Sequence, residues 1–380
     1  MLDTSTPVLV LNAIHYGALG LSRSLGRLGV TVYNQSPQRS VPVFFSKYSR
    51  RNILWDIDAK GAERTIDFLT SLGHQLPCRA ILIPTCDVTA VLVADHDAVL
   101  RKSFIFPERR PELVHALCSK KGMYELARSF DIPTPETSFP QSRHEVLPFL
   151  ECARFPVVLK TIQNRLREHA RHGIKRIVHG RDELLRLYDA LEDPENPNLM
   201  LQEYIPGDED TNWMFNGYFD HNSDCLIGLT GKKIRQFPAY AGVTSLGVCL
   251  KNEVVEKTAK AFMKAIGYKG VLDCGFRFDA RDGRYKVYDI NPRIGATFRL
   301  FVDDLGLDVA RVFYMDMTGQ PVTAGTIQQG RKWIVEDCDL VSSVRYCADR
   351  RLAFNDWVHS LRGIHETALF ASDDPWPVCG

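Results

Sequence analysis

The stretch that decides the fold is "GVLDCGFRFDARDGR" (270–284) followed by "YKVYDINPRIGATFRLF" (285–301). Two apolar runs flank the turn sequence "ARDG", and this pattern predicts a β-hairpin. Alternate residues of a strand share a face, so Asp289, Asn291 and Arg293 are expected to point the same way. Three such groups are costly to bury unless something pairs with them. Either a cation that carries phosphates or a structural cluster of ion pairs would satisfy them.

The hairpin also predicts which residues face each other across the two strands. Pairing Asp279 with Arg284 at the turn places Asp289 opposite residues 273–275. Asp273 lies in that range, and its alternation can put it on the face of Asp289. A change of register by one residue would turn Asp273 to the other face.

Two carboxylates and the amide oxygen of Asn291 would form an oxygen-only site for a cation. Mg²⁺ is typically held by one or two carboxylates, with water and phosphate at the other positions. The alternative is a solvated cross-strand cluster that Arg277 and Arg293 neutralise. The hairpin alone does not decide between these two interpretations.

Length and composition set broad limits on the rest of the chain. Its 380 residues are 45% hydrophobic and 24% charged, which is ordinary for a globular protein with more than one domain. A net charge of +1 lacks the strong basic excess of a nucleic-acid binder. No signal peptide and no apolar run of membrane-spanning length is present, and the ten cysteines show no CxxC pair or zinc-like spacing. We expect a cytoplasmic protein with free cysteines and with neither nucleic-acid nor membrane partners.

The order of elements favours an α/β domain at the N-terminus. Residues 8–35 follow the pattern strand, glycine-bearing turn, amphipathic helix, strand, which is typical of a βαβ unit. "RAILIPTCD" (79–87) is a further buried strand with a polar end. No GxGxxG motif follows the first strand, so a dinucleotide fingerprint is excluded there.

Two lysines and one extended segment are candidates for nucleotide binding. Lys120 begins a helix, and Lys160 ends the buried strand "FPVVLK". "LQEYIPGDE" (201–209) is an extended segment whose backbone could contact an adenine edge, with acids nearby for ribose hydroxyls. Between them lies a basic stretch, 163–176, that could close over phosphates. Each element taken singly has a structural alternative. The two lysines could be surface residues, the basic stretch a solvated loop, and the extended segment a strand that ends in an acid-capped turn.

The ordered set of these motifs resembles the ATP-grasp superfamily. Within it, the chain is similar to carboxylate–amine ligases of the D-aspartate ligase type. The resemblance covers about residues 5–322, and "KVYDINPRIG" (286–295) is its most specific piece.

The resemblance implies α/β and α+β architecture in four parts. An N-terminal open α/β domain of the pre-ATP-grasp, Rossmann-like kind would span 1–115. A two-part ATP-grasp domain would follow, with a first subdomain and phosphate lid at 116–200 and a second subdomain with the metal site at 201–322. Residues 323–380 would form a C-terminal segment.

The resemblance also implies residue roles. Lys160 and Arg293 would act in catalysis. Independently of the resemblance, Arg299 is a candidate to grip the substrate carboxylate, because arginine suits bidentate recognition. His15 is a second candidate for substrate contact, because it lies in the turn after the first strand. Mg²⁺ would be held by Asp289 and Asn291, with Asp273 as a further ligand. The nucleotide contacts would come from Lys120, Lys160, Gln202, Glu203, Ile205 and Glu209, with Asp208 and Asp210 as rivals of the last.

Three features depart from the family pattern. Gly275 stands where many relatives carry an acid that binds metal, so Asp273 would have to take over that position. Ser119 stands where relatives usually carry Asp before the first lysine. The phosphate loop is basic and contains only Gly173, so side chains would have to replace backbone contacts to phosphate.

The expected function is an ATP-dependent ligase that joins a carboxylate to an amine, with substrates of the amino-acid type. It would proceed through an acyl phosphate and release ADP and phosphate, with ATP and Mg²⁺ as cofactors. The partners would be the small-molecule carboxylate and amine, and a homodimer is a possible assembly. The alternatives are an ATP-grasp carboxylase or kinase, which would share the nucleotide residues, and a nucleotide-binding module without catalysis.

Overall fold

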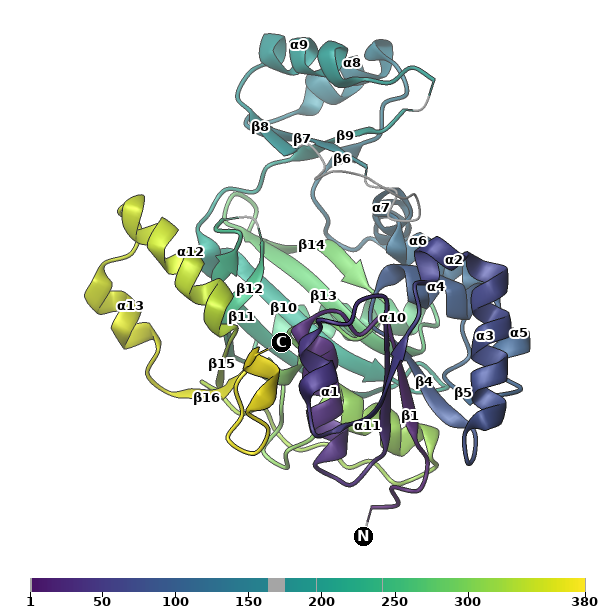
Figure 1. Ribbon diagram of the computed structural model, residues 1–380. Helices are drawn as coiled ribbons and strands as arrows, with labels where there is room; N and C mark the ends of the chain where they lie inside the picture. The colour runs from purple at the N-terminus through teal and green to yellow at the C-terminus, as the bar shows by residue number, and fades with distance from the viewer. Residues whose placement is uncertain (1, 163–174, 196, 241, 380) are drawn as a thin grey trace.

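A computed structural model describes residues 2–162, 175–195, 197–240 and 242–379 of the chain. In this part the chain forms three β-sheets with helices packed around them (Figure 1). No helix in these ranges combines the length and the apolar character that crossing a membrane requires.

The N-terminal sheet is parallel throughout and has the strand order β3-β2-β1-β4-β5. Its strands are β1 (Val8–Leu11), β2 (Val32–Ser36), β3 (Ser49–Leu54), β4 (Ala80–Pro84) and β5 (Phe104–Ile105). The connecting and following helices are α1 (Tyr16–Gly26), α2 (Ile57–Lys60), α3 (Ala62–Gln75), α4 (Asp87–Asp95), α5 (Asp97–Leu100) and α6 (Pro111–Cys118). All four residues of β1 are buried, as expected for a central parallel strand covered on both faces. The open α/β architecture expected from the sequence is confirmed.

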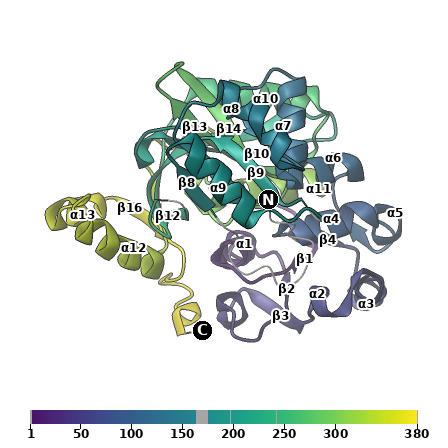
Figure 2. The same cartoon turned by 90° about the horizontal axis from the view of Figure 1, so that it is seen from above.

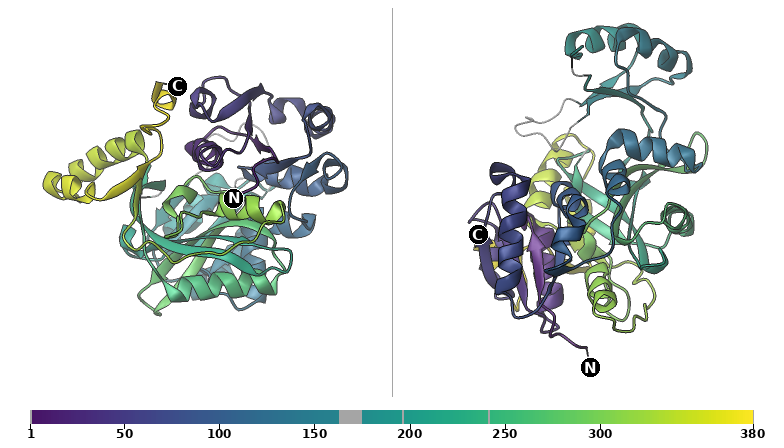
Figure 3. Two further views of the ribbon diagram at one scale, coloured as in Figure 1. Left: turned by 90° about the horizontal axis from the view of Figure 1, so that it is seen from below. Right: turned by 90° about the vertical axis from the view of Figure 1, so that its right-hand side faces the viewer.

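A small antiparallel sheet forms a separate lobe, with the strand order β6-β9-β7-β8. Its strands are β6 (Thr137–Ser138), β7 (Val157–Thr161), β8 (Lys175–Val178) and β9 (Leu199–Glu203). Helices α8 (Arg143–Cys152) and α9 (Arg181–Leu191) cover one face through a shared apolar core. The lobe stands above the rest of the molecule in Figure 1 and in the right-hand view of Figure 3.

The largest sheet has seven strands in the order β14-β13-β10-β11-β12-β15-β16, and only β15 and β16 pair in parallel. The strands are β10 (Asn212–Phe219), β11 (Cys225–Phe237), β12 (Val243–Cys249), β13 (Gly270–Asp279), β14 (Arg284–Asn291), β15 (Lys332–Ile334) and β16 (Ile364–Thr367). The last two strands belong to the C-terminal segment, which therefore extends this sheet.

Five helices accompany the large sheet: α7 (Lys120–Ser129), α10 (Glu253–Ala265), α11 (Val309–Met317), α12 (Glu336–Ala348) and α13 (Phe354–Ser360). Local sequence explains the ends of α10. The Asn252 side chain accepts a hydrogen bond from the Val255 N–H, and Gly267 adopts a φ of +67° after the helix. The Ser119 side chain likewise caps α7 by accepting from the Gly122 N–H. Asparagine and serine before a helix and glycine after it are residue types that favour such ends.

The two faces of the large sheet are buried against different partners. Residues such as Met214 and Tyr218 on β10 share a core with α1 and α11, whereas Phe215 and Phe219 share one with α7 and α10. This alternation along β10 is the period of two that a strand covered on both faces requires. Viewed from above, the N-terminal sheet and α1 lie beside the large sheet (Figure 2). Consequently, the strand ends of the N-terminal sheet approach the end of β14.

Candidate active site in the cleft between the sheets

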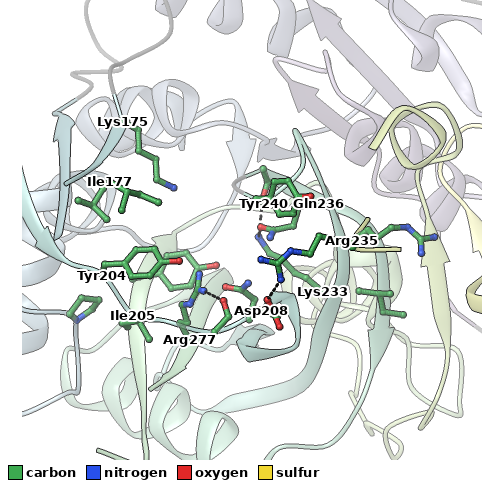
Figure 4. Close-up of a pocket in the computed structure, with 18 of the residues that line it drawn as sticks. Lys175, Ile177, Tyr204, Ile205, Asp208, Lys233, Arg235, Gln236, Tyr240 and Arg277 are labelled. Carbon is green, nitrogen blue, oxygen red and sulfur yellow. Dashed lines mark hydrogen bonds and ion pairs between the residues drawn. The ribbon is translucent and has the colours of Figure 1, made fainter. Parts of the chain in front are cut away.

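A cleft of about 790 Å³ separates the small sheet from the large one. The small lobe contributes Lys160, Lys175 and Ile177, and the segment after β9 contributes Tyr204 and Ile205. Figure 4 shows Lys175, Ile177, Tyr204 and Ile205 on one side of the cleft. Lys233, Gln236 and Tyr240, from the large sheet and its following loop, lie on the other. The cleft is therefore closed by two sheets that belong to different lobes.

Lys160 lies at the end of β7, on the small-sheet side of the cleft. Its Nζ donates to Gln202 Oε1 on the neighbouring strand at 3.0 Å. Burial lowers the pKa of Lys160 to about 8, and the positive charges of Lys120 and Lys175 add to the effect. Burial lowers the pKa of Lys175 as well, with Arg277 and Lys233 contributing. The lining thus gathers positive charges without enough negative charge to balance them, which favours an anionic ligand.

The extended segment after β9 is arranged differently from the lysines. Ile205 is buried, and the Glu203 carboxylate is held by Arg281 at 2.6 Å and Lys286 at 3.1 Å. Glu203 therefore offers a ligand its backbone only. Asp208 lines the cleft, whereas Glu209 lies in the short helical turn η2 (Glu209–Thr211) with its side chain outside the described part of the structure.

Close to its turn, the β13–β14 hairpin has the register that the turn predicts. Asp279 pairs with Arg284, and a shift between Gly275 and Phe276 then places Gly275 opposite Asp289. The next pair on the same face sets Asp273 opposite Asn291. Asp273, Asp289 and Asn291 thus share one face at the end of the hairpin.

Asp289 and Asn291 are already engaged with neighbouring groups. Lys120 Nζ, from the first residue of α7, contacts Asp289 Oδ1. Asn291 Nδ2 donates to Asp289 Oδ2 at 2.9 Å, while Asn291 Oδ1 accepts from Arg293 Nη2 at 3.0 Å. The structure therefore brings Lys120 to the carboxylate end of the site, and Lys160 to the opposite wall.

Arg293 ties this end of the hairpin to the N-terminal sheet. Its Nε donates to Asp87 Oδ1 at 3.1 Å, and Asp87 is the first residue of α4. Although burial disfavours the charge of Arg293, the carboxylates of Asp87, Asp273 and Asp289 raise its pKa. It is therefore a fixed positive charge beside the hairpin carboxylates.

His15 lies nearby and caps α1. Its Nδ1 accepts from the Gly17 N–H at 3.1 Å, and its Nε2 lies 3.1 Å from the Thr85 carbonyl oxygen. Burial lowers the pKa of His15, and the charge of Arg293 acts in the same direction. Both ring nitrogens of His15 thus serve the local fold.

Asp273 is more deeply set than Asp289. Burial raises its pKa to about 6, with Asp289 adding to the rise and Arg293 opposing it. A Cβ at Gly295 would meet its carboxylate oxygen at 2.5 Å, so a larger residue at position 295 would have to displace the Asp273 side chain. Arg277, the alternative ion-pair partner considered from the sequence, instead donates to the Gly207 carbonyl oxygen at 2.6 Å.

The donor set fits a hard divalent cation. Two carboxylates and one amide share the face, while the described residues contain no group of three or more His, Cys, Asp or Glu side chains suited to a metal. This is the sparse set expected for Mg²⁺, which takes its remaining ligands from phosphate and water. To bind the cation through its oxygen, the Asn291 side-chain amide would have to rotate, because its nitrogen now faces Asp289.

The expectation that Arg299 contacts the substrate carboxylate is wrong. Arg299 is buried, and its guanidinium is bound by Glu366 at 2.8 and 2.6 Å and by Asp308. Although burial disfavours its charge, Glu366 and Asp308 raise its pKa. Arg299 is a structural residue that joins β16 to the segment after the hairpin.

Three residues that line the cleft were not predicted from the sequence: Lys233, Tyr346 and Arg351. Lys233 lies on β11, and its Nζ donates to the Gly242 carbonyl oxygen at 3.2 Å. Tyr346 and Arg351 come from α12 and the turn after it, and Arg351 forms an ion pair with Asp208 at 3.3 Å. Alternation along "GKKIRQF" (231–237) could have indicated Lys233. No local pattern points to the two C-terminal residues, because they reach the cleft through tertiary packing.

Several solved enzymes share the fold of this chain, although their sequences differ strongly from it. Among solved structures, N5-carboxyaminoimidazole synthetase from Staphylococcus aureus aligns with a TM-score of 0.64 at 12% identity, covering 87% of this chain and 82% of that one. L-amino acid ligase from Bacillus licheniformis gives 0.61 at 14% identity, covering 87% and 79%. The biotin carboxylase domain of Hydrogenobacter thermophilus 2-oxoglutarate carboxylase, solved with MgADP and bicarbonate, gives 0.63 at 18% identity, covering 85% and 73%. These likenesses confirm the fold expected from the sequence.

In sequence, the chain is similar to D-aspartate ligase from Enterococcus faecium strain Aus0004. The two are 30% identical over 247 residues, which is 61% of this chain and 57% of that protein. The chain thus matches little more than half the length of this relative. No protein-family model matches the chain.

Proposed function

We propose that the protein is an ADP-forming carboxylate–amine ligase that uses ATP. One observation carries the proposal: the hairpin carboxylate of Asp289 lies within electrostatic range of Lys160, in a cleft that several further cations line. A polyphosphate would pair directly with the cations of the cleft, and with the hairpin carboxylates through a bound divalent cation. The similarity to D-aspartate ligase supports a carboxylate and an amine as the reacting groups.

Different residues of the cleft would bind different parts of ATP. Lys160 would pair with phosphate, and the segment around Ile205 would contact the adenine through backbone groups and apolar surface. Asp289, Asn291 and Asp273 would hold Mg²⁺, which when bound neutralises phosphate charge during transfer. The basic stretch 163–176 is proposed as the phosphate lid, although residues 163–174 lie outside the described part of the chain.

The reaction would occur in two transfers. A substrate carboxylate oxygen bonds to the γ-phosphorus of ATP, the bond to the β-phosphate oxygen breaks, and ADP leaves. The amine then attacks the acyl carbon, the bond from that carbon to the phosphate oxygen breaks, and one amine proton leaves with the phosphate. The products are an amide and free phosphate. Arg293 would stabilise negative charge as it develops, because Asp87 fixes its position beside the hairpin.

Other parts of the proposal rest on the resemblance. The domain division at residues 115, 200 and 322 and the amino-acid type of the substrates are both inferred in this way. ATP is the phosphoryl donor, so we propose that the reaction takes place in the cytoplasm. His15 would lie next to the substrate, because it is beside Arg293. Arg299 has no such role in the proposal.

ADP release across a panel of carboxylate–amine pairs tests the function, with mass detection of products. ADP formation that requires both substrates, together with an amide product, is the expected result. Bicarbonate replaces the carboxylate in one arm, and the amine is omitted in another, to detect a carboxylase or a kinase. ATP binding without ADP release under any condition would instead indicate a module without catalysis.

A further inference from the structure

Helix α12 packs on the molecule with its polar side and turns its apolar side outward. A helix that packs on a globular core usually does the reverse. Its side toward the large sheet is polar, with Asp339, Ser342, Ser343 and Tyr346 all buried. Asp339 accepts two hydrogen bonds from Arg235 on β11, at 2.8 and 2.7 Å. The packed face of the helix is therefore held mainly by polar contacts.

The apolar residues of α12 are on the outward side. Leu340, Val341 and Val344 are 54%, 59% and 65% exposed, and Ala348 is exposed as well. Their spacing places them in a single stripe along the helix. Helix α13 adds Phe354, which is 67% exposed.

The two helices project from the body of the molecule as an arm (Figures 1, 2 and 3). In the described part of the chain, nothing covers the stripe on α12. A contiguous apolar stripe that a protein leaves exposed marks an interaction surface. The α10 helix shows the usual pattern instead, with Val255, Phe262 and Met263 buried on the sheet.

Charges at the two ends of the stripe indicate what covers it. Asp337 lies four residues before Val341 and Arg345 four residues after it, and both are exposed on the stripe side. If two copies of α12 pair antiparallel about a two-fold axis at Val341, Asp337 of each copy meets Arg345 of the other. This self-complementarity is what an interface between identical subunits requires. The opposed helix dipoles would add to the attraction.

We propose that the outward face of α12 is a homodimer interface in which two copies of the helix pair antiparallel around Val341. Arg345 also contacts Asp349 of its own helix at 2.8 Å, but this pair is exposed and contributes little to stability. A guanidinium has five N–H donors, so the same Arg345 serves both carboxylates. The interface is remote from the hairpin carboxylates, and the proposal does not depend on the proposed function.

Sedimentation velocity over a concentration series tests the surface. The wild type is expected to dimerise, and Val344→Glu is expected to raise the dimer dissociation constant at least about tenfold, because it buries an unpaired charge in the apolar stripe. Val254→Glu is the matched control, because Val254 is 56% exposed on α10, away from the arm. Circular dichroism melts verify that both variants remain folded.

A charge exchange tests the antiparallel pairing itself. Asp337→Arg alone and Arg345→Asp alone each place like charges opposite one another and should weaken the homodimer. Mixing the two variants should restore a dimer, because every Arg then meets an Asp. The double variant, Asp337→Arg with Arg345→Asp, should dimerise by itself.

Several results would overturn the proposal. A wild type that stays monomeric at high concentration excludes a second copy as the occupant of the stripe. A dimer that Val344→Glu leaves intact places the interface elsewhere. A mixture of the two charge variants that fails to dimerise, while Val344→Glu still disrupts the wild type, excludes the antiparallel pairing.

Discussion

The two walls of the cleft differ in how their charges are satisfied. On the large sheet, the hairpin carboxylates are held in a network: Asp289 contacts Lys120 and Asn291, and Asn291 contacts Arg293. On the small sheet, Lys160 has a neutral partner, Gln202, and burial lowers its pKa to about 8. One wall is organised by protein contacts, whereas the other holds positive charge that an anionic ligand would stabilise. The first wall should therefore govern the rate of the chemistry, and the second should govern nucleotide affinity.

The largest effect is expected from the organised wall. Asp289→Ala should lower turnover by roughly 10³-fold, because it removes a charge placed to hold the cation during transfer. Asn291→Ala should act in the same direction. Steady-state ADP release at saturating substrates measures both.

Asp282→Asn provides the control for this change, since Asp282 lies at the turn end of the same hairpin. It should keep near wild-type turnover. If Asp289→Ala retains wild-type turnover at limiting Mg²⁺, the assignment of the cation site is wrong.

The second prediction separates Asp273 as a metal ligand from Asp273 as a structural group. Asp273→Asn should raise the Mg²⁺ concentration needed for half-maximal rate by about tenfold. The melting temperature at pH 7 should stay the same or rise, because a raised pKa means that the fold disfavours the ionised form. A magnesium titration beside a thermal melt measures both quantities. A large drop in melting temperature with unchanged magnesium dependence would contradict the metal role.

The contrast between the walls also explains which features could be predicted from sequence. The hairpin register follows from a local turn and from alternation, so the shared face of Asp289 and Asn291 could be predicted. The shift between Gly275 and Phe276 could not, because a bulge has no clear signal in a single sequence.

Contacts between residues far apart in the sequence could not be predicted, because they depend on how distant elements pack together. The groups that bind Arg299 include Glu366, which is 67 residues away and arrives through β16. The sequence indicated only a C-terminal segment at 323–380, and not which sides of α12 and α13 the body covers. The C-terminal wall of the cleft, with Tyr346 and Arg351, depends on the same packing.

The third prediction concerns the cationic wall and its pH dependence. Lys160 is protonated below its folded pKa of about 8 and loses its charge above it. Nucleotide affinity should therefore fall as the pH rises through about 8. Bound phosphate should raise the pKa of Lys160, so nucleotide binding at pH 8 to 9 should take up protons.

Calorimetry in buffers of different ionisation enthalpy measures this uptake. Lys160→Met should weaken ATP binding by roughly tenfold and abolish the uptake, since it removes a close charge pair. Lys160→Arg should retain binding at high pH, because a guanidinium stays charged throughout this range. Proton uptake that persists in Lys160→Met would show that another group is responsible.

The smallest effect is expected from the C-terminal edge of the cleft. Arg351 pairs with Asp208 at 3.3 Å, and both side chains are well exposed, at 63% and 76%. Exposed pairs contribute at most about 1 kcal/mol, so Arg351→Ala should change nucleotide affinity by less than about fivefold. Any change should shrink further as salt is added, since exposed charges are screened. Arg362→Ala, an exposed arginine of the same segment, is the matched control for net charge. A loss of affinity comparable to that of Lys160→Met would show that the C-terminal segment binds phosphate directly, and the division of roles between the two walls would then be wrong.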